Sequence, residues 1–460
     1  MEEAKKQNAK QSKKEVSMPV VHPNAAGIDV GSTFHYVAIG QTMEDIRSFG
    51  VYSSDLHELC QWLKEENVDT VALESTGTYW QNLFIMLQDY GLNPILVSGK
   101  FTKNVQGKKT DVKDCQWIQR LHMLGLLPNS FQPDNYTEKV RQYSRHRQSL
   151  IEKGADYIKK MQKSLRMMNI RLDIALSDVT GKSGKAMIDA ILSGETDPKK
   201  LATLANYRVR KSKEELEKAL TGIFKPEYIF ELKHSYELYY FYQSKISECD
   251  EKIAELLLDK ITENEKEDGL QRPDFRKEER KKKNKNSPNM DIEKLAFQMT
   301  GGIDLSEIDG VSGNTILAII SEIGVDVSKF ATAKHFASWL RLSPNNKISG
   351  GKVLSNRTAK KKNRLSQALQ RAANVVGNNL KKGALHAFFK RIQLKKGYME
   401  AVVATARKIA VIIWNMLAKK EPFTYDTDEN YQEKIRQQVI KNMQRKLKNL
   451  NIKPEELIFN

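Results

Sequence analysis

The stretch GIDVGSTFHYVAI, residues 27–39, decides how the first part of this chain folds. It contains two short apolar runs, Gly27–Val30 and Tyr36–Ile39, and a third run follows at Ile46–Tyr52. Short apolar runs broken by turn residues are typical of strands joined by tight turns. We therefore expect an antiparallel meander of three strands at the start of the fold.

Outward from these strands, the pattern alternates between helix and strand as far as residue 124. Leucines at helical spacing over 56–63 predict a helix, with Ser54 or Asp55 as its cap. The next elements should be a strand at Thr70–Leu73, a helix at Tyr79–Tyr90, a strand at Pro94–Val97 and a helix at Val112–Leu124. This mixed α/β order is the one that a ribonuclease-H-like (RuvC-like) fold requires, although other three-layer folds share it.

The remainder of the chain reads as mainly helical. Residues 136–260 hold few Pro or Gly, and 232–258 form a long amphipathic pattern, which predicts either a coiled-coil arm or a solvated helical spacer. The run RKEERKKKNK at 276–285 indicates a flexible linker or an RNA-touching loop. We expect a disordered tail (1–24), a ribonuclease-H-like domain (25–130), a helical arm (131–262), a charged linker (263–290), a helical C-terminal domain (291–420) and a charged helical tail (421–460).

The charge of the chain points to a polyanionic partner. The 460 residues carry a formal net charge of +18, and residues 331–420 hold twenty Lys or Arg against one acid, Glu400. Nucleic acid is the first interpretation, because basic surfaces attract phosphate backbones. A membrane-surface protein is the rival, but the best apolar run, Ile409–Ala418, is too short to span a bilayer. Without a secretory signal in residues 1–18, we expect a cytoplasmic protein.

The three cysteines give no sign of a redox or zinc function. Cys60, Cys115 and Cys249 are far apart in the sequence and form no CxxC pair. We expect all three to pack as small hydrophobic residues.

Four carboxylates are placed to share one cleft. Asp29 and Glu74 lie at the ends of the first and fourth expected strands, where each strand meets its loop. Asp111 and Asp114 are three residues apart and therefore lie on one face of a helix. Four acids held together repel unless cations lie among them, and oxygen ligands select Mg²⁺ or Mn²⁺. A two-metal site of this kind cleaves phosphodiesters. Each acid alone is more often a cap or a loop residue.

Two histidines lie near this set. His35 and His122 could be metal ligands, but a lone histidine is more often packed or on the surface, and we assign neither a role.

A Gly-x-x-Gly turn in the C-terminal part predicts a helix-hairpin-helix. It lies in IDGVSGNTILAIISEIG, residues 308–324, where the amides from Gly310 to Gly313 could hold a DNA phosphate at a helix N-terminus. An ordinary packing corner between helices fits the same residues equally well.

A serine in a basic, glycine-rich run is a candidate nucleophile. In RLSPNNKISGGKVLSNRTAKKKNRL, residues 341–365, Ser349 precedes two glycines and Lys352, so cations would surround its hydroxyl. By chemistry alone a plain loop serine is the better interpretation, and Ser343 or Ser355 could compete. The cations of this run that we expect to bind nucleic acid are Lys347, Lys352, Arg357, Lys360, Lys361, Lys362 and Arg364.

Taken together, GIDVGS, ALESTGTYW, KTDVKDCQWIQRL, GVSGNT and SP-x-x-x-x-SGGK resemble the insertion sequence 110 family of DEDD transposases over residues 25–420. The resemblance implies Asp29, Glu74, Asp111 and Asp114 as the DEDD set and Ser349 as a serine that bonds covalently to DNA. It also implies dimers or tetramers, and a structured guide RNA that bridges donor and target DNA. One departure is Arg341, where relatives often have glycine.

Two other functions remain open from the residues. A metal-dependent, RuvC-like junction-resolving nuclease needs the same four acids but no covalent serine step. In a non-enzymatic architectural protein, the acids would be structural and the basic surface would bind nucleic acid.

Overall fold

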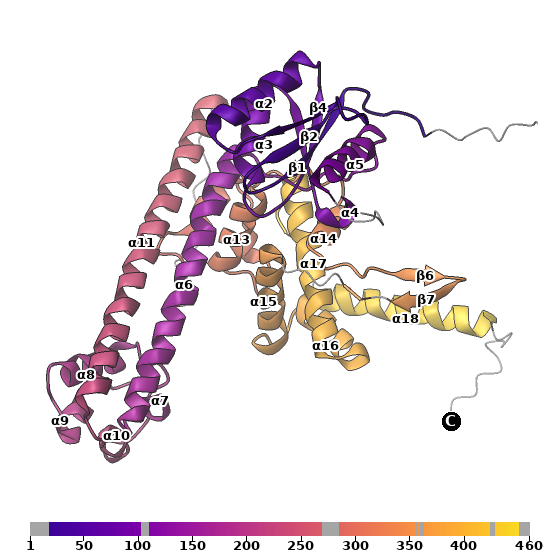
Figure 1. Cartoon of the computed structure of the whole chain (residues 1–460). Coiled ribbons are helices and arrows are strands. Elements are labelled where there is room, and N and C mark those ends of the chain that lie inside the picture. The colour runs from indigo at the N-terminus through magenta and orange to yellow at the C-terminus, as the bar shows by residue number, and fades with distance from the viewer. Residues whose placement is uncertain are drawn as a thin grey trace, which may run out of the picture. The chain divides into compact units, whose positions relative to one another are not determined.

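The computed structural model describes residues 18–102, 110–268, 285–355, 357–358, 363–423 and 428–449 (Figure 1). The chain divides into two compact units, Met1–Gln132 and Pro133–Asn460. Each unit contains its own cluster of buried hydrophobic side chains.

The first unit is built on a five-stranded sheet of order β3-β2-β1-β4-β5. The strands are β1 (Ala25–Val30), β2 (His35–Ala38), β3 (Ile46–Phe49), β4 (Thr70–Glu74) and β5 (Asn93–Val97). The first three form an antiparallel meander, and β4 and β5 run parallel to β1. The helices are α2 (Ser53–Glu65), α3 (Trp80–Asp89), α4 (Gly99–Thr102) and α5 (Asp111–Met123). This mixed α/β sheet is consistent with the expected ribonuclease-H-like domain.

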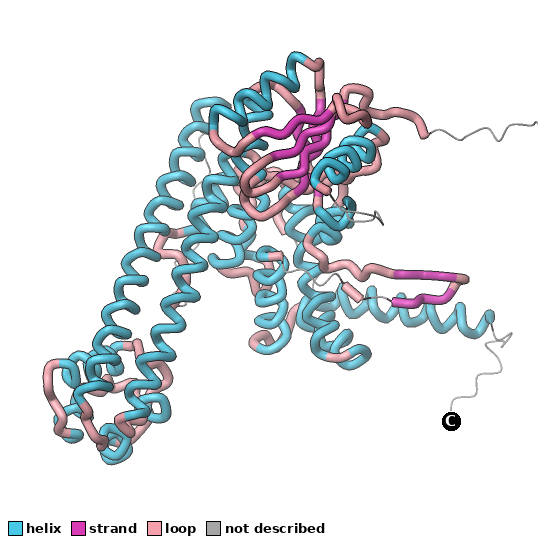
Figure 2. Tube along the Cα trace, in the orientation of Figure 1, coloured by secondary structure: helices cyan, strands magenta, loops and turns pink. Residues whose placement is uncertain are grey.

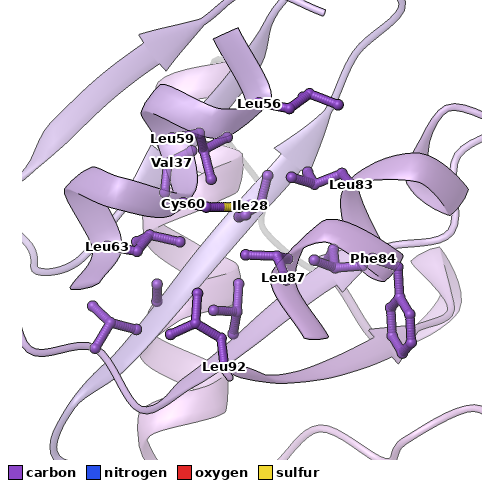
Figure 3. Close-up of a cluster of buried hydrophobic side chains, with 14 of the residues drawn as sticks. Ile28, Val37, Leu56, Leu59, Cys60, Leu63, Leu83, Phe84, Leu87 and Leu92 are labelled. Carbon is purple, nitrogen blue, oxygen red and sulfur yellow. The ribbon is translucent and has the colours of Figure 1, made fainter. Parts of the chain in front are cut away.

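Helices cover both faces of this sheet. Ile28 and Val37 point toward α2 and α3, where they join a buried cluster with Leu59, Leu83 and Leu87 (Figure 3). Burying one such side chain contributes about 1.5–3 kcal/mol. The opposite face of β1, β2 and β4 is covered by α5. The sheet is therefore the middle layer of three.

Three local features of the first unit differ from the expectations. The residue that caps α2 is Tyr52, whose backbone N–H donates to Asp55 Oδ2 at 3.0 Å, and not Ser54 or Asp55. The four-residue helix α4 was not expected. The N–H groups of Val21 and His22 both donate to the carbonyl oxygen of Met123, so this part of the expected disordered tail is attached to the end of α5.

Two long antiparallel helices dominate the second unit. They are α6 (Asn135–Met167) and α11 (Pro226–Asp268). Tyr136 at the start of α6 donates to the Leu256 carbonyl oxygen near the end of α11, while Tyr157 stacks on Tyr242 nearer its start. Residues later in α6 thus contact residues earlier in α11, so the two helices lie side by side and run in opposite directions (Figures 1 and 2).

Short helices connect the far ends of this pair and form a small tip with its own core. They are α7 (Leu172–Ala175), α8 (Lys182–Leu192), α9 (Pro198–Thr203) and α10 (Lys213–Leu220). We call α6, α11 and this tip the arm.

The C-terminal part of the second unit is mostly helical. Its elements are α12 (Ile292–Met299), the 3₁₀ turn η2 (Leu305–Glu307), α13 (Gly313–Ile323), α14 (Ala333–Trp339), the hairpin β6 (Lys347–Ser349) and β7 (Lys352–Ser355), α15 (Arg364–Asn378), α16 (Ala384–Lys396), α17 (Tyr398–Lys419) and α18 (Asp428–Asn449). On α13, buried Glu322 pairs with Arg145 of α6 at 2.7 Å and with Arg141 at 3.5 Å. These ion pairs attach α13 to the arm.

α17 contains the apolar run noted in the sequence. By length and composition this helix could cross a membrane, but half of its apolar window is buried inside the unit. That burial is the pattern of a core helix in a folded protein.

Candidate active site

The sheet brings Asp29 and Glu74 side by side. β1 and β4 are parallel neighbours, and Ile28 is in register with Leu73, so the next residue on each strand is one of these acids. Side chains alternate between the faces of a strand. Gly27 and Ala72 face α5, and therefore Asp29 and Glu74, two residues further on, face it as well.

Helix α5 packs across the sheet face that carries Asp29 and Glu74, and its first turn lies beside these two acids. A Cβ added at Gly27 would lie 2.6 Å from the Cys115 carbonyl oxygen and 2.7 Å from Gln119 Cα, so the helix backbone rests directly on β1. At the other end, His122 Nε2 lies 2.9 Å from the hydroxyl of Thr70, the first residue of β4. The helix therefore runs antiparallel to β1 and β4, and its N-terminus lies where both strands end.

Asp111 and Asp114 occupy that first turn. Thr110 caps the helix by accepting a hydrogen bond from the Lys113 N–H. The positive end of the helix dipole favours anionic side chains there. The buried Cys115 thiol has its pKa raised to about 12, first by burial and further by the charges of Asp29 and Asp114. Both carboxylates thus lie close to the same thiol. We call Asp29, Glu74, Asp111 and Asp114 the acidic edge.

Glu74 is positioned by the unexpected helix α4. Thr102 Oγ1 donates to Glu74 Oε2 at 2.6 Å. A Cβ at Gly99 would collide with Glu74 Oε1, so the carboxylate lies directly against the backbone of this residue. Thr102 could not be recognised from the sequence, because a four-residue helix carries no periodic signal.

The acidic edge offers the oxygen donors that Mg²⁺ or Mn²⁺ prefers. No three His, Cys, Asp or Glu side chains within the described ranges are gathered closely enough to form a complete metal cluster. Asp111 is exposed, and the other three acids are half-buried. The donor chemistry and the shared face fit a divalent cation, although the ligand geometry is not preformed.

The two nearby histidines are packed residues. His122 is buried against Thr70 and His22, and burial lowers its pKa to about 4. His35 is buried, its pKa is lowered by desolvation, and it faces the α2 and α3 side with its strand partner Val30. All three cysteines are buried and free, which confirms their expected packing role.

The glycine turn before α13 packs closely against other helices. Gly310 has a φ of 81°, and a Cβ there would collide with the Ala372 carbonyl oxygen of α15. At Gly313 a Cβ would lie 2.9 Å from Ile292 Cγ2. The element before the turn is the one-turn η2, so a full first helix of the expected helix-hairpin-helix is absent from this described segment. The packing interpretation explains both glycines.

A basic cavity lies beside this turn. Its volume is about 310 Å³, and its lining includes Asn314 in the first turn of α13 together with Arg145, Arg364 and Arg371. Of the other cations expected to bind nucleic acid, Lys347, Lys352 and Arg357 are exposed. Lys360, Lys361 and Lys362 lie outside the described residues.

Ser349 is exposed at the end of β6, at the tip of the hairpin. Gly350 and Gly351 form the turn with φ values of 54° and 75°, a conformation that favours glycine. Ser349 is in register with Lys352. Of its competitors, Ser343 is half-buried, and Ser355 Oγ accepts a hydrogen bond from the Arg357 N–H at 3.4 Å. Ser349 is therefore the most accessible of the three hydroxyls.

Comparison with protein-family models gives two matches. Residues 26–170 match a model described as a transposase, the DEDD transposase of IS110. Residues 304–390 match a model described as a transposase of the IS116/IS110/IS902 family. No curated protein sequence matches the chain. The first match spans the acidic edge, and the second spans Ser349.

Proposed function

Because the chain belongs to the insertion sequence 110 family of transposases, enzymes that cut and rejoin DNA, we propose that the acidic edge holds its divalent metal ions and that Ser349 is its nucleophile. The observation that carries the first part is the meeting of two strand ends with the first turn of α5, the turn that contains Asp111 and Asp114. The exposed position of Ser349 beside Lys352 supports the second part.

The four carboxylates would hold Mg²⁺ or Mn²⁺. When bound, such ions supply positive charge that polarises the scissile phosphate and favours the ionised form of an attacking hydroxyl. The chain's own contribution is to fix the ligands: β1 and β4 hold Asp29 and Glu74, Thr102 orients Glu74, and the first turn of α5 presents Asp111 and Asp114.

In the proposed serine step, Ser349 Oγ forms a bond to phosphorus while the bond from phosphorus to a deoxyribose oxygen breaks. The serine proton is lost, and the leaving oxygen gains one. Attack by the deoxyribose hydroxyl of another strand reverses the step, which restores the serine and rejoins DNA without an external energy source. Lys347 and Lys352 flank the serine and would neutralise phosphate charge.

The family relationship also supports partners that the chain alone does not specify. We propose donor and target DNA as substrates, a structured RNA as guide, a homodimer or tetramer as the working form, and a cytoplasmic, nucleoid-associated location in a bacterial or archaeal cell. Sequencing the RNA that co-purifies with the protein tests whether the protein binds a structured guide RNA. An absence of enriched structured RNA would contradict that part of the proposal.

Substitution of the α5 acids tests the metal site. Asp111→Ala and Asp114→Ala should each abolish recombination, while the melting temperature without metal stays unchanged or rises, because one repelling charge is removed. Recombination assays in Mg²⁺ and thermal melting in a chelator measure the two effects. Near wild-type recombination by both variants contradicts the metal site.

Substitution of the serine tests the nucleophile. Ser349→Ala should eliminate both the protein–DNA adduct and recombination, and leave assembly intact, because only a hydroxyl is lost. Ser343→Ala and Ser355→Ala are matched controls. Mass spectrometry of trapped complexes that places DNA on another residue would falsify the assignment.

The competing enzyme function is a metal-dependent junction nuclease. A denaturing gel after incubation with DNA separates the two, because the serine enzyme gives a protein-linked band and the nuclease gives free nicked product. Membership in a family that cuts and rejoins DNA excludes a purely architectural protein.

A further inference from the structure

An exposed tyrosine projects from an ordered loop at the tip of the arm. The loop connects α9 to α10, and we call residues 206–213 the tip loop. Tyr207 is 84% exposed, more than most tyrosines, which bury their ring and leave only the hydroxyl accessible. The position of this ring is therefore not explained by packing within the arm.

Hydrogen bonds fix the backbone of the tip loop. The Asn206 N–H donates to Ser183 Oγ at 2.9 Å, and the Val209 N–H donates to the Asn206 carbonyl oxygen at 2.9 Å. The Val209 side chain packs against the core of the tip. Tyr207 is thus held outward between two anchored residues.

Cations surround this ring. Arg208 donates from Nε to the Tyr207 hydroxyl at 3.0 Å, and its guanidinium carbon lies 5.3 Å from the ring centroid. Arg210, Lys211 and Lys213 follow within five residues, and all are exposed. Glu215 pairs with Lys211 at 2.8 Å, whereas no carboxylate of the described chain lies within ion-pair distance of Arg210. The loop combines an aromatic face with positive charge.

We propose that the tip loop binds unpaired nucleotides, with a base stacked on Tyr207 and the neighbouring phosphates on Arg210 and Lys211. Aromatic faces accept any exposed base, and nearby cations follow the backbone, which is how proteins bind single strands without reading their sequence. Bases within a duplex are stacked on each other and leave no face for Tyr207. The unpaired nucleotides would belong to a single-stranded segment of either RNA or DNA.

This proposal rests only on the chain's acting on nucleic acid. It requires neither the acidic edge nor Ser349, and its test needs no cleavage. The two proposals therefore succeed or fail separately.

Photocrosslinking of the full-length protein tests the tip loop directly. Two short single strands of the same sequence, one DNA and one RNA, carry 5-iodouracil, which crosslinks to aromatic side chains that stack on it. Binding is carried out in a chelator, so the DNA stays intact. Trypsin then releases the peptide Leu201–Arg208, in which Tyr207 is the sole aromatic residue, and mass spectrometry locates the adduct.

We expect crosslinks on this peptide with at least one strand, and the more reactive strand identifies RNA or DNA as the source. The double variant Arg210→Glu/Lys211→Glu keeps both Tyr207 and the peptide, and should lower the crosslink yield about tenfold. The matched control Lys153→Glu, an exposed charge on α6, should leave the yield unchanged. Tyr207→Phe keeps the ring and should retain the crosslink.

Two results overturn the proposal. One is crosslinking to other peptides of the chain without any adduct on Leu201–Arg208. The other is an equal Tyr207 yield from a duplex that carries the same base, because a stacked base pair should not reach the ring.

Discussion

The acidic edge lies on a sheet that helices cover on both faces, whereas Ser349 lies on a two-stranded hairpin with exposed apolar side chains. Under the acids, Gly27, Ile28 and Leu73 are buried. In the hairpin, Ile348 is 61% exposed and Leu354 is 68% exposed. An isolated two-stranded hairpin is marginally stable in water.

This difference in burial matches the two proposed roles, which are metal binding at the acidic edge and attack on DNA by Ser349. The backbone that carries metal ligands must keep them near one another, so that a bound ion can draw the side chains together, and this needs a rigid support. A nucleophile that bonds to DNA needs to reach into the substrate, and an exposed hairpin tip permits that. We expect changes beneath the acidic edge to lower stability and activity together, and changes in the hairpin to lower activity alone.

The strongest test of this comparison is Gly27→Ala. The added Cβ would meet the α5 backbone, which cannot move without separating Asp111 and Asp114 from the strands. We expect a loss of about 3 kcal/mol in unfolding free energy together with loss of recombination. Denaturant unfolding and a recombination assay measure both.

Gly154→Ala is its matched control. At this position on α6 a Cβ would make only ordinary contacts, the nearest at 3.6 Å, and alanine favours a helix. We expect a gain of about 0.5–1 kcal/mol. If Gly27→Ala proves as harmless as this control, then α5 does not rest on β1 as described.

A smaller effect should follow from Thr102→Val, which removes the hydroxyl that orients Glu74. By analogy with residues that orient metal ligands elsewhere, we expect metal affinity and recombination to fall by about tenfold to a hundredfold. Titration with Mn²⁺ measures the first effect without turnover. Thr102→Ser should restore both, and a failure of that rescue would assign Thr102 a packing role instead.

The smallest effect concerns Arg341, which precedes the hairpin and has a φ of 58°. It ends α14 in a left-handed turn, where the Leu342 N–H donates to the Ala337 carbonyl oxygen at 3.1 Å. Arg341→Gly should raise stability by about 1 kcal/mol, because glycine adopts this conformation without strain. Recombination should be unchanged, and a lower melting temperature would show that the arginine side chain has a compensating contact.

Apart from the short helix α4, the strands and helices of the first unit were predictable because their apolar residues follow a strand or helix pattern. β4 and α5 begin and end within about one residue of expectation, which is the usual precision of helix boundaries. The four acids stood out because each lies near the end of a strand or in the first turn of a helix.

Contacts between residues distant in sequence could not be predicted. Thr102 is 28 residues from Glu74, and nothing in its neighbourhood marks it as the partner of a carboxylate. Glu322 is 177 residues from Arg145 in the sequence, yet the two are joined by a bidentate pair. The hairpin was missed because its short strands are exposed on both faces and lack an alternating pattern.

The length of the arm sets how far the tip loop lies from the first turn of α6. With 33 residues, α6 holds the tip loop about 50 Å from its own first turn, the span of roughly fifteen base steps. Because each helical residue adds about 1.5 Å of length and about 100° of rotation, the lengths of α6 and α11 set both the distance and the direction of the tip. Removing seven residues from each helix would shorten it by about 10 Å and keep Tyr207 on nearly the same side, whereas removing four would turn the tip by about 40°. The reach of the tip can therefore be shortened with little change in its direction, whereas the deletion that turns the tip also shortens the arm by about 6 Å.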